Sequence, residues 1–155
     1  MQDAYEDERD RARRVYRSVR YVHSPALNER VYFTAEGFSH LMFKTLSSER
    51  ERRSQVARFK LLSRAIKLVG LSTTYQEYER VSKKLEVMSY KKVVRKAMVI
   101  KYWGIIAIVG GKKIKVIIRK KGHNADAHFW SVVPGWKTSG RRDVRFTMKG
   151  NPEED

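Results

Sequence analysis

The amino-acid sequence predicts an α+β protein in which N-terminal helices pack on a C-terminal antiparallel sheet of about four strands. The first 70 residues repeat apolar side chains at helical spacing, whereas the residues after Ala97 form runs rich in valine and isoleucine. Helices that precede strands, instead of alternating with them, are typical of this class. Along the 155 residues we expect an N-terminal helical extension at 1–28, a main domain at 29–149 and an acidic tail at 150–155.

The first helix is predicted over residues 2–20. Its apolar side chains, among them Ala12 and Tyr16, fall roughly on one face, and the opposite face mixes acidic and basic side chains. Pro25 closes this segment. Residues 29–33 follow as a short strand of β-branched and aromatic residues.

Two further helices are expected before residue 71. Thr34 suits the N-cap of the second helix, which carries apolar residues as far as Leu46. Ser48 and Glu51 have the spacing of a capping box, which predicts that the third helix starts there. Gly70 fits the C′ position that follows this helix.

The C-terminal half has the pattern of an antiparallel meander. Gly110 and Gly111 stand between two β-rich runs and suit a type I′ turn, in which both central residues need positive φ. Residues 71–96 follow neither the helical nor the strand period, so the sequence leaves their structure open. The expected strands are 97–109, 112–121, 127–133 and a short edge strand at 143–148.

The chain is strongly and unevenly basic. It carries 34 Lys and Arg against 17 Asp and Glu, a formal net charge of +17. Residues 87–149 hold 16 of the basic side chains and two acids, a net charge of +14. Such an excess indicates a polyanionic partner, either a nucleic acid or an anionic membrane surface. A membrane surface is disfavoured, because the basic residues lie in β-rich runs and not on one helix face.

The composition also excludes several kinds of site and indicates a cellular compartment. There is no cysteine, which excludes a disulfide framework, a cysteine nucleophile and a thiolate zinc site. No run of 18 apolar residues is present, and the charged N-terminal stretch lacks the apolar core of a signal peptide. We therefore expect a cytoplasmic protein that neither spans nor binds a membrane.

Strand alternation predicts which side chains share a face. In 112–121, Ile114, Val116 and Ile118 lie on one face, which we expect to pack on the helices. The other face then presents Lys113, Lys115 and Arg119 as a row of cations. Such a row suits a nucleic-acid backbone, although lysine on an outer sheet face is also an ordinary solubilising feature.

In the strand expected at 127–133, polar and apolar side chains are mixed on both faces. Strict alternation places His128, Trp130 and Val132 on one face, and Phe129, Ser131 and Val133 on the other. A histidine can move a proton and a tryptophan can stack on a base. Equally, Trp130 can belong to the core with His128 as a hydrogen-bonded neighbour.

No metal or cofactor site is predicted. The four histidines lack ligand spacing, and the acids do not cluster as a two-metal nuclease needs, unless the fold brings Glu36, Asp126 and a histidine together. There is also no Walker loop and no dinucleotide-binding fingerprint. A nuclease of this composition would use the 2′-hydroxyl of RNA as its nucleophile.

Four stretches in this order resemble the phage and toxin members of the barnase–EndoU–colicin–RelE-like ribonucleases. The resemblance covers about residues 29–137, and AHFWSVVPGW is its most distinctive part. It implies that the main domain, 29–149, is ribonuclease-like. The stretches are VYFTAEGFSHL, RFKLLSRAIKLV, IIAIVGGKKIKVIIRKK and AHFWSVVPGW.

The resemblance also implies site residues. His40 matches the catalytic histidine on the first helix after a strand, and Lys44 matches the basic residue one turn later. Ser131 matches the small hydroxyl of a late strand, and His128 and Trp130 match its polar and aromatic neighbours. Many relatives have a second histidine on that helix, whereas HLMFK has none, so Lys44 or His128 must replace it as proton donor.

These observations support two functions. The first is a metal-independent endoribonuclease toxin that cleaves RNA by 2′-hydroxyl attack and is controlled by an acidic antitoxin or inhibitor. The second is a non-catalytic RNA- or DNA-binding module on the same basic scaffold. For the first, catalysis is assigned to His40, Lys44, Ser131 and His128, and RNA binding to Trp130, Lys113, Lys115, Arg119, Arg53 and Lys60.

Overall fold

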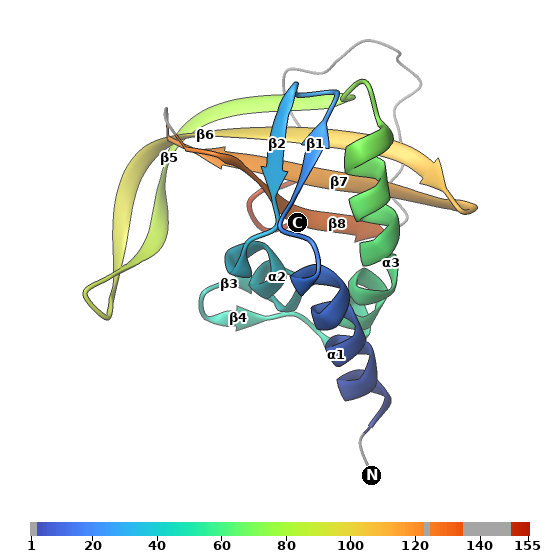
Figure 1. The fold of residues 1–155 in the computed structure, drawn as a ribbon. Coiled ribbons are helices and arrows are strands. Elements are labelled where there is room, and N and C mark those ends of the chain that lie inside the picture. The colour runs from blue at the N-terminus through green and yellow to red at the C-terminus, as the bar shows by residue number, and fades with distance from the viewer. Residues whose placement is uncertain (1–2, 123–124, 135–149) are drawn as a thin grey trace.

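A computed structural model describes residues 3–122, 125–134 and 150–155 of the chain (Figure 1). The strand expected at 143–148 lies outside these residues. Within them, no helix is long and apolar enough to cross a membrane. The elements are α1 (Ala4–Arg17), β1 (Tyr21–Ser24), β2 (Glu29–Tyr32), α2 (Ala35–Met42), β3 (Phe43–Thr45), β4 (Ser48–Glu49), α3 (Arg52–Leu71), β5 (Glu77–Ser89), β6 (Lys92–Val109), β7 (Lys112–Lys121) and β8 (Ala127–Pro134).

The strands confirm the α+β class and enlarge the expected sheet. Six strands pair in the order β1-β2-β8-β7-β6-β5, and β3 and β4 form a separate hairpin. All neighbours in the large sheet are antiparallel except β2 and β8, which run parallel. The prediction of about four strands was too low, because residues 77–89 and both N-terminal strands, β1 and β2, also join the sheet.

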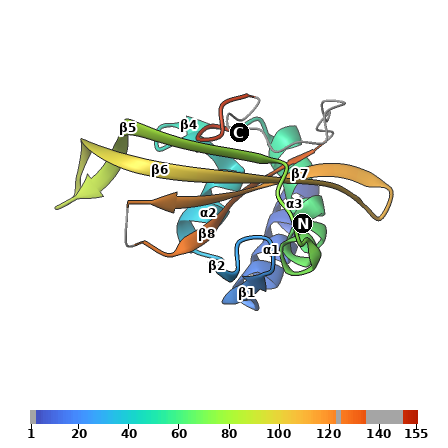
Figure 2. The same cartoon turned by 90° about the horizontal axis from the view of Figure 1, so that it is seen from above.

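One face of the sheet packs on the helices. Ile114, Val116 and Ile118 are fully buried there, as alternation predicted, in one cluster with Ala12 and Tyr16 of α1. Figure 2 shows the helices gathered on one side of the long strands β6 and β7. The opposite face carries a smaller cluster of Ile100, Tyr102, Ile117 and Trp130.

The turn signals were read correctly in two places. The Thr34 hydroxyl caps α2 by accepting a hydrogen bond of 3.3 Å from the backbone N–H of Gly37. Gly110 and Gly111 adopt φ of 57° and 76° between β6 and β7, as a type I′ hairpin requires. Both signals depend on the local chain alone, so tertiary packing does not alter them.

The boundaries of the second and third helices were predicted wrongly. α2 ends at Met42 instead of Leu46, and Ser48 lies in β4 instead of capping α3. The backbone N–H of Arg50 donates to the carbonyl of Met42 at 2.8 Å, so the chain turns through the β3–β4 hairpin before α3 begins. α3 also continues through Gly70, which is therefore not its C′ residue.

Close contact between α2 and β8 depends on a glycine. A methyl group at Gly37 would overlap the carbonyl oxygen of Phe129 and approach the Tyr16 hydroxyl to 2.7 Å. The lack of a side chain lets α2 lie directly against β8. This contact brings His40, in the last turn of α2, next to Trp130 of β8.

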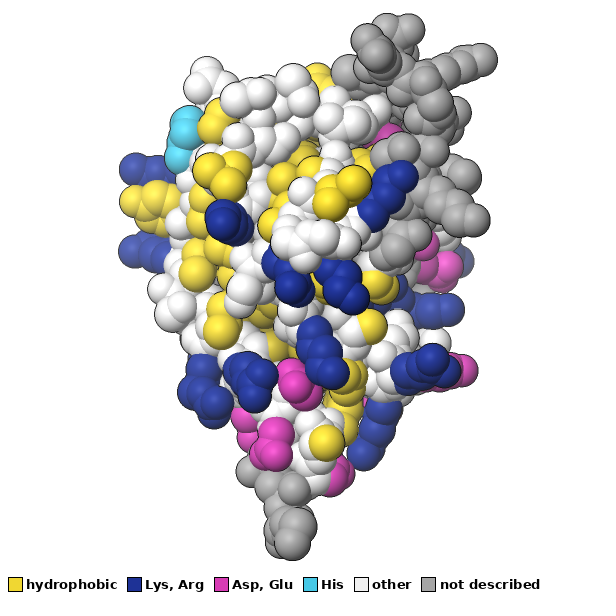
Figure 3. Space-filling model, turned by 90° about the vertical axis from the view of Figure 1, so that its right-hand side faces the viewer, with side chains coloured by type: hydrophobic (Ala, Val, Ile, Leu, Met, Phe, Trp, Pro, Cys, Tyr) yellow, Lys and Arg dark blue, Asp and Glu magenta, His cyan; other side chains and the backbone are white. Residues whose placement is uncertain are grey.

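α3 has one buried side and one basic side. The basic side, with the β6–β7 turn and Pro134, lines a groove of about 590 Å³. Figure 3 shows the side of the molecule on which α3 lies, where Lys and Arg side chains frame apolar patches. Three of the predicted RNA-binding residues meet in this groove with two further cations: Arg53, Lys60, Arg64, Lys112 and Lys113.

The hairpin of β5 and β6 extends beyond the rest of the sheet. Its two strands are 13 and 18 residues long, and Figure 1 shows it curling away from the body of the molecule. The side chain of Tyr90 at its turn is 98% exposed. Because its outer part faces water on both sides, the residues there show no apolar alternation, and for this reason the sequence left 71–96 open.

Candidate active site

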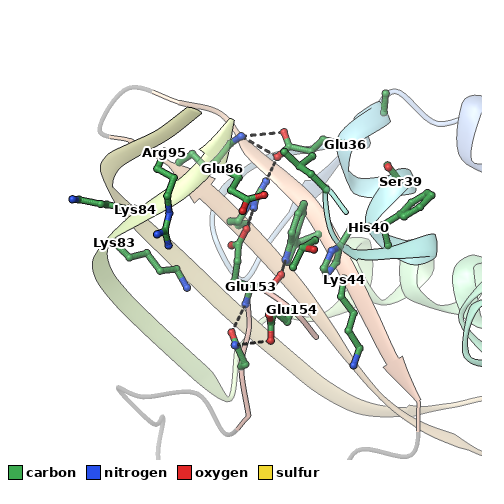
Figure 4. Close-up of a pocket in the computed structure, with 18 residues that line it drawn as sticks. Glu36, Ser39, His40, Lys44, Lys83, Lys84, Glu86, Arg95, Glu153 and Glu154 are labelled. Atoms are coloured by element: carbon green, nitrogen blue, oxygen red, sulfur yellow. Dashed lines mark hydrogen bonds and ion pairs between the residues drawn. The ribbon is translucent and has the colours of Figure 1, made fainter. Parts of the chain in front are cut away.

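A pocket of about 710 Å³ lies between α2, the β3–β4 hairpin and the curled β5–β6 hairpin. Figure 4 shows His40 and Glu36 on one wall and Lys83, Lys84 and Arg95 on the other. Arg119 and Trp130 contribute from β7 and β8, and the acidic residues Glu153 and Glu154 also line the pocket. The pocket thus joins four parts of the chain that are far apart in the sequence.

A β-bulge sets the side-chain pattern of β8. Ile117 pairs with Ser131 whereas Ile118 pairs with Phe129, so Trp130 is an extra residue in the register. Phe129 and Val132 consequently lie on the helix side, and Trp130 lies on the pocket side. Ser131, opposite the pocket-side Ile117, shares that side. The strict alternation expected from the sequence is therefore wrong, and the bulge brings Ser131 to the face that carries His128 and Trp130.

Trp130 is the centre of this cluster. The His40 ring stacks on its indole at 3.8 Å with an interplanar angle of 12°, and the Arg119 guanidinium carbon lies 3.4 Å from the ring centre. Two groups this close to one ring centre must lie on opposite faces of the indole. Trp130 therefore holds the site together, and in this conformation neither face is free to stack on a base as predicted.

Both predicted histidines are buried neutral imidazoles. Arginine can only donate, so Nε2 of His40 accepts from Arg50 and Nε2 of His128 accepts from Arg119, each at 3.0 Å. Burial, reinforced by the charges of Arg50, Arg58 and Arg119, lowers the pKa of His40 to about 2. Burial and the Arg119 charge lower the pKa of His128 to about 3. At neutral pH both rings are therefore unprotonated at Nε2, and neither is an imidazolium that can release a proton as a general acid.

Arg50 and Arg58 belong to the site, and the sequence analysis missed them as site residues. Arg50 donates from Nε to the His40 carbonyl at 3.0 Å. Arg58 reaches around the open edge of β8 and donates to the Ser131 hydroxyl at 2.7 Å and to the Val132 carbonyl at 3.2 Å. Burial lowers the pKa of Arg58 to about 9. The sequence did contain one sign that Arg58 is a site residue. It lies on the apolar side of α3, among buried residues that include Phe59 and Leu62.

The predicted solvent-facing row of cations on β7 is wrong. Lys115 is fully buried and pairs with the buried Glu77 at 3.1 Å. Arg119 is 1% exposed and pairs with Glu36 and Glu153. The pocket face of β7 is covered by the acidic residues of other segments, so its cations meet protein carboxylates instead of water.

Lys44 lies at the rim of the pocket. It belongs to β3 and not to α2, and its side chain is exposed. In Figure 4 the Lys44 side chain runs away from the His40 ring. Of the four predicted catalytic residues, His40, His128 and Ser131 meet around Trp130, and Lys44 borders them.

Over the described part of the chain, no group of three or more His, Asp or Glu side chains has the arrangement of a metal site. His123 lies outside that part. Comparison with protein-family models, curated proteins and solved structures found no match to this chain. The function is therefore argued from the site alone.

The buried histidines predict an unusual acid sensitivity. An imidazole in the unfolded chain titrates near pH 6.5, whereas these two stay neutral in the fold. Their contribution to stability is complete above that pH and is lost as the pH falls below it. Because an unfolded imidazole is only partly protonated near pH 6.5, each histidine costs about 1.4 kcal/mol over the whole interval from pH 7.5 to 5.5. The free energy of unfolding should therefore fall by about 3 kcal/mol between these two pH values.

Urea unfolding across this pH range measures the effect. His128→Gln should remove about half of the pH dependence. The matched control is His23→Gln, at an exposed position of β1, which should leave it unchanged. A free energy of unfolding that stays constant from pH 7.5 to 5.5 would show that the two rings are not held neutral by the fold.

Proposed function

We propose that this protein is a metal-independent endoribonuclease that cleaves RNA by attack of the 2′-hydroxyl group. The observation that carries the proposal is the meeting of two neutral imidazoles, three guanidinium groups and a hydroxyl in one connected cluster, of which His40 and Arg119 line the pocket. This set supplies a base, positive charge for a pentavalent phosphate and a hydrogen bond to orient it. The net charge of +17 supplies attraction for the RNA backbone.

In the proposed reaction His40 acts as the general base. Arg50 moves from Nε2 of His40 to the phosphate, and the freed nitrogen takes the proton of the 2′-hydroxyl. The 2′-oxygen then bonds to phosphorus while the bond from phosphorus to the 5′-oxygen breaks. Arg50 and Arg58 stabilise the negative charge that develops, and Ser131 orients the phosphate.

The leaving 5′-oxygen needs a proton donor. His128 cannot provide the proton near neutral pH, because burial and the charge of Arg119 hold its pKa at about 3. We assign this role to the ammonium group of Lys44, the alternative that the sequence offered. Its long side chain at the pocket rim can turn toward a bound substrate.

The same proposal includes RNA docking and control. The basic groove on α3 that contains Arg53, Lys60 and Lys113 contacts the RNA backbone outside the pocket. An enzyme that cleaves RNA endangers the cell that makes it, so we expect a toxin that is restrained by an acidic antitoxin or inhibitor. Charge complementarity makes an acidic partner the suitable one.

Incubation with end-labelled RNA in EDTA tests the proposal. Cleavage should persist without divalent cations and leave 2′,3′-cyclic phosphate or 3′-phosphate ends together with 5′-hydroxyl ends. An RNA with a single 2′-deoxy nucleotide at the cleaved position should resist cleavage there. Loss of activity in EDTA with rescue by magnesium, or 5′-phosphate products, would contradict the mechanism.

One observation favours a second function, a nucleic-acid-binding module without catalysis. Nε2 of both histidines already accepts a hydrogen bond from arginine, so neither ring offers a free base in this conformation. Under this alternative the same assay shows RNA bound and left intact at every protein concentration.

A further inference from the structure

Residues 151–155, called here the acidic segment, fold back into the candidate active site. The backbone N–H groups of Glu154 and Asp155 donate to the Asn151 carbonyl at 3.1 and 2.8 Å, which closes the segment into a turn. The Trp130 indole N–H donates to the carbonyls of Pro152 and Glu153, both at 3.1 Å. The segment thus rests on the tryptophan at the centre of the site.

The acidic segment places anionic or carbonyl oxygens at two positions. At the first, the Glu153 carboxylate accepts from Arg119 at 2.5 Å and from the Tyr102 hydroxyl. At the second, the Asp155 backbone oxygen accepts from Arg50 at 3.1 Å, from the Ser131 hydroxyl at 2.9 Å and from Arg58. Each position offers at least one guanidinium and one hydroxyl, which is the donor set that phosphate oxygens take.

The acidic segment also carries a cost for the molecule. Oδ2 of Asp155 is buried and has no hydrogen-bond partner among the described residues. Burial also raises the pKa of the Asp155 carboxyl group, although Lys115 and Arg58 oppose this. A buried acceptor without a partner lowers the stability of the arrangement. Release of the segment returns this oxygen to water, so the cost favours replacement of the segment by a phosphate, which brings negative charge to Arg50, Arg58 and Ser131.

We propose that the pocket, together with the adjoining cluster of Arg50, Arg58 and Ser131, binds two phosphates of a single strand of RNA, and that the acidic segment occupies both positions as an intramolecular competitor. The inference rests on the proposed function for the identity of the ligand and adds where its phosphates bind. Arg119 and Tyr102 hold one phosphate, and Arg50, Arg58 and Ser131 hold the one that reacts. A single strand is required because both positions are buried against Trp130.

Displacement of the segment can be measured by binding alone. The probe is a fluorescent ten-nucleotide 2′-deoxy single strand, which cannot be cleaved through a 2′-hydroxyl. Glu153→Gln removes the charge that holds Arg119 and should tighten binding of the probe roughly tenfold. The control, Asp7→Asn, removes the same charge from an exposed side chain of α1 that lies outside the pocket and the acidic segment, and its affinity should stay at the wild-type value.

A second readout follows the segment itself. The chain has three tryptophans, so the indole N–H resonance of Trp130 can be followed in protein labelled with ¹⁵N-tryptophan. This resonance should shift when the probe binds, because the carbonyls of Pro152 and Glu153 leave the indole. Glu153→Ala should shift it without the probe and should also bind the probe more tightly.

Three results would overturn the inference: no binding of the probe, equal affinities of Glu153→Gln and Asp7→Asn, or a Trp130 signal that stays in place when the probe is bound. These results are separable from failure of the proposed function. Tighter binding by Glu153→Gln together with intact RNA in the cleavage assay would support the phosphate site and reject the nuclease.

Discussion

Replacement of His40 by glutamine is expected to lower the rate of RNA cleavage by about 100- to 10,000-fold, the usual contribution of a general base. Glutamine keeps an acceptor for Arg50 and much of the ring volume next to Trp130, but it cannot take the 2′-hydroxyl proton. The measurement is single-turnover cleavage of labelled RNA, with affinity for the uncleavable probe determined in parallel. Affinity should change little, because the backbone carbonyl of residue 40 still accepts from Arg50 and the glutamine side chain replaces the second acceptor.

His23→Gln is the control for this experiment, since His23 is exposed on β1 and lies outside the pocket. His40→Gln with the wild-type cleavage rate would show that His40 is only a packing partner of Trp130. Loss of both cleavage and binding would instead indicate that the variant has lost the architecture of the site.

Gly37→Ala is expected to destabilise the protein by about 2 kcal/mol, a typical cost of overpacking a close contact. The added methyl group meets the backbone carbonyl of Phe129, which cannot rotate away, so α2 must move off β8. The shift separates His40 from Trp130, so cleavage should fall together with stability. Alanine favours the helix by about 1 kcal/mol relative to glycine. The expected loss of stability is the net value after this gain.

Gly70→Ala is the matched control in α3. A methyl group there approaches only the side chain of Val22, at 3.1 Å, and that side chain can adjust. Chemical unfolding should show Gly70→Ala to be as stable as the wild type or slightly more stable. If both variants unfold at the same denaturant concentration, the close approach of α2 to β8 does not determine stability.

Local patterns were sufficient for much of the fold. The helix-facing residues of β7, the Thr34 cap and the Gly110–Gly111 turn each depend on the spacing or backbone freedom of neighbouring residues, so the sequence predicted them correctly. The capping box predicted from Ser48 does not form, because Arg50 makes contacts that hold this stretch in the β3–β4 hairpin. The Arg50 backbone N–H donates to the Met42 carbonyl and its side chain donates to the His40 carbonyl. Capping rules consider only the first turn of a helix, so they do not include these contacts.

The site was only partly predictable for the same reason. His40, His128 and Trp130 were identified, but the bulge that moves Ser131 to their side depends on how β8 pairs with β7. The burial of Lys115 and Arg119 depends on Glu77, Glu36 and Glu153, which come from three other segments. Strand alternation predicts a face, but it does not predict what covers that face.

The projecting β5–β6 hairpin has a consequence for how molecules reach the pocket. Its inner part is anchored by Tyr102 and Ile100, whereas residues 91–97 are exposed and have no second layer against them. Such a segment opens in a local, sub-global step that needs far less free energy than unfolding of the whole protein. Arg95 lies in this segment and Lys84 pairs with Ala97 at its inner end, so part of one wall of the pocket should open with it. Its amide hydrogens should therefore exchange with solvent through that local opening, whereas those of β7 should exchange only when the core unfolds.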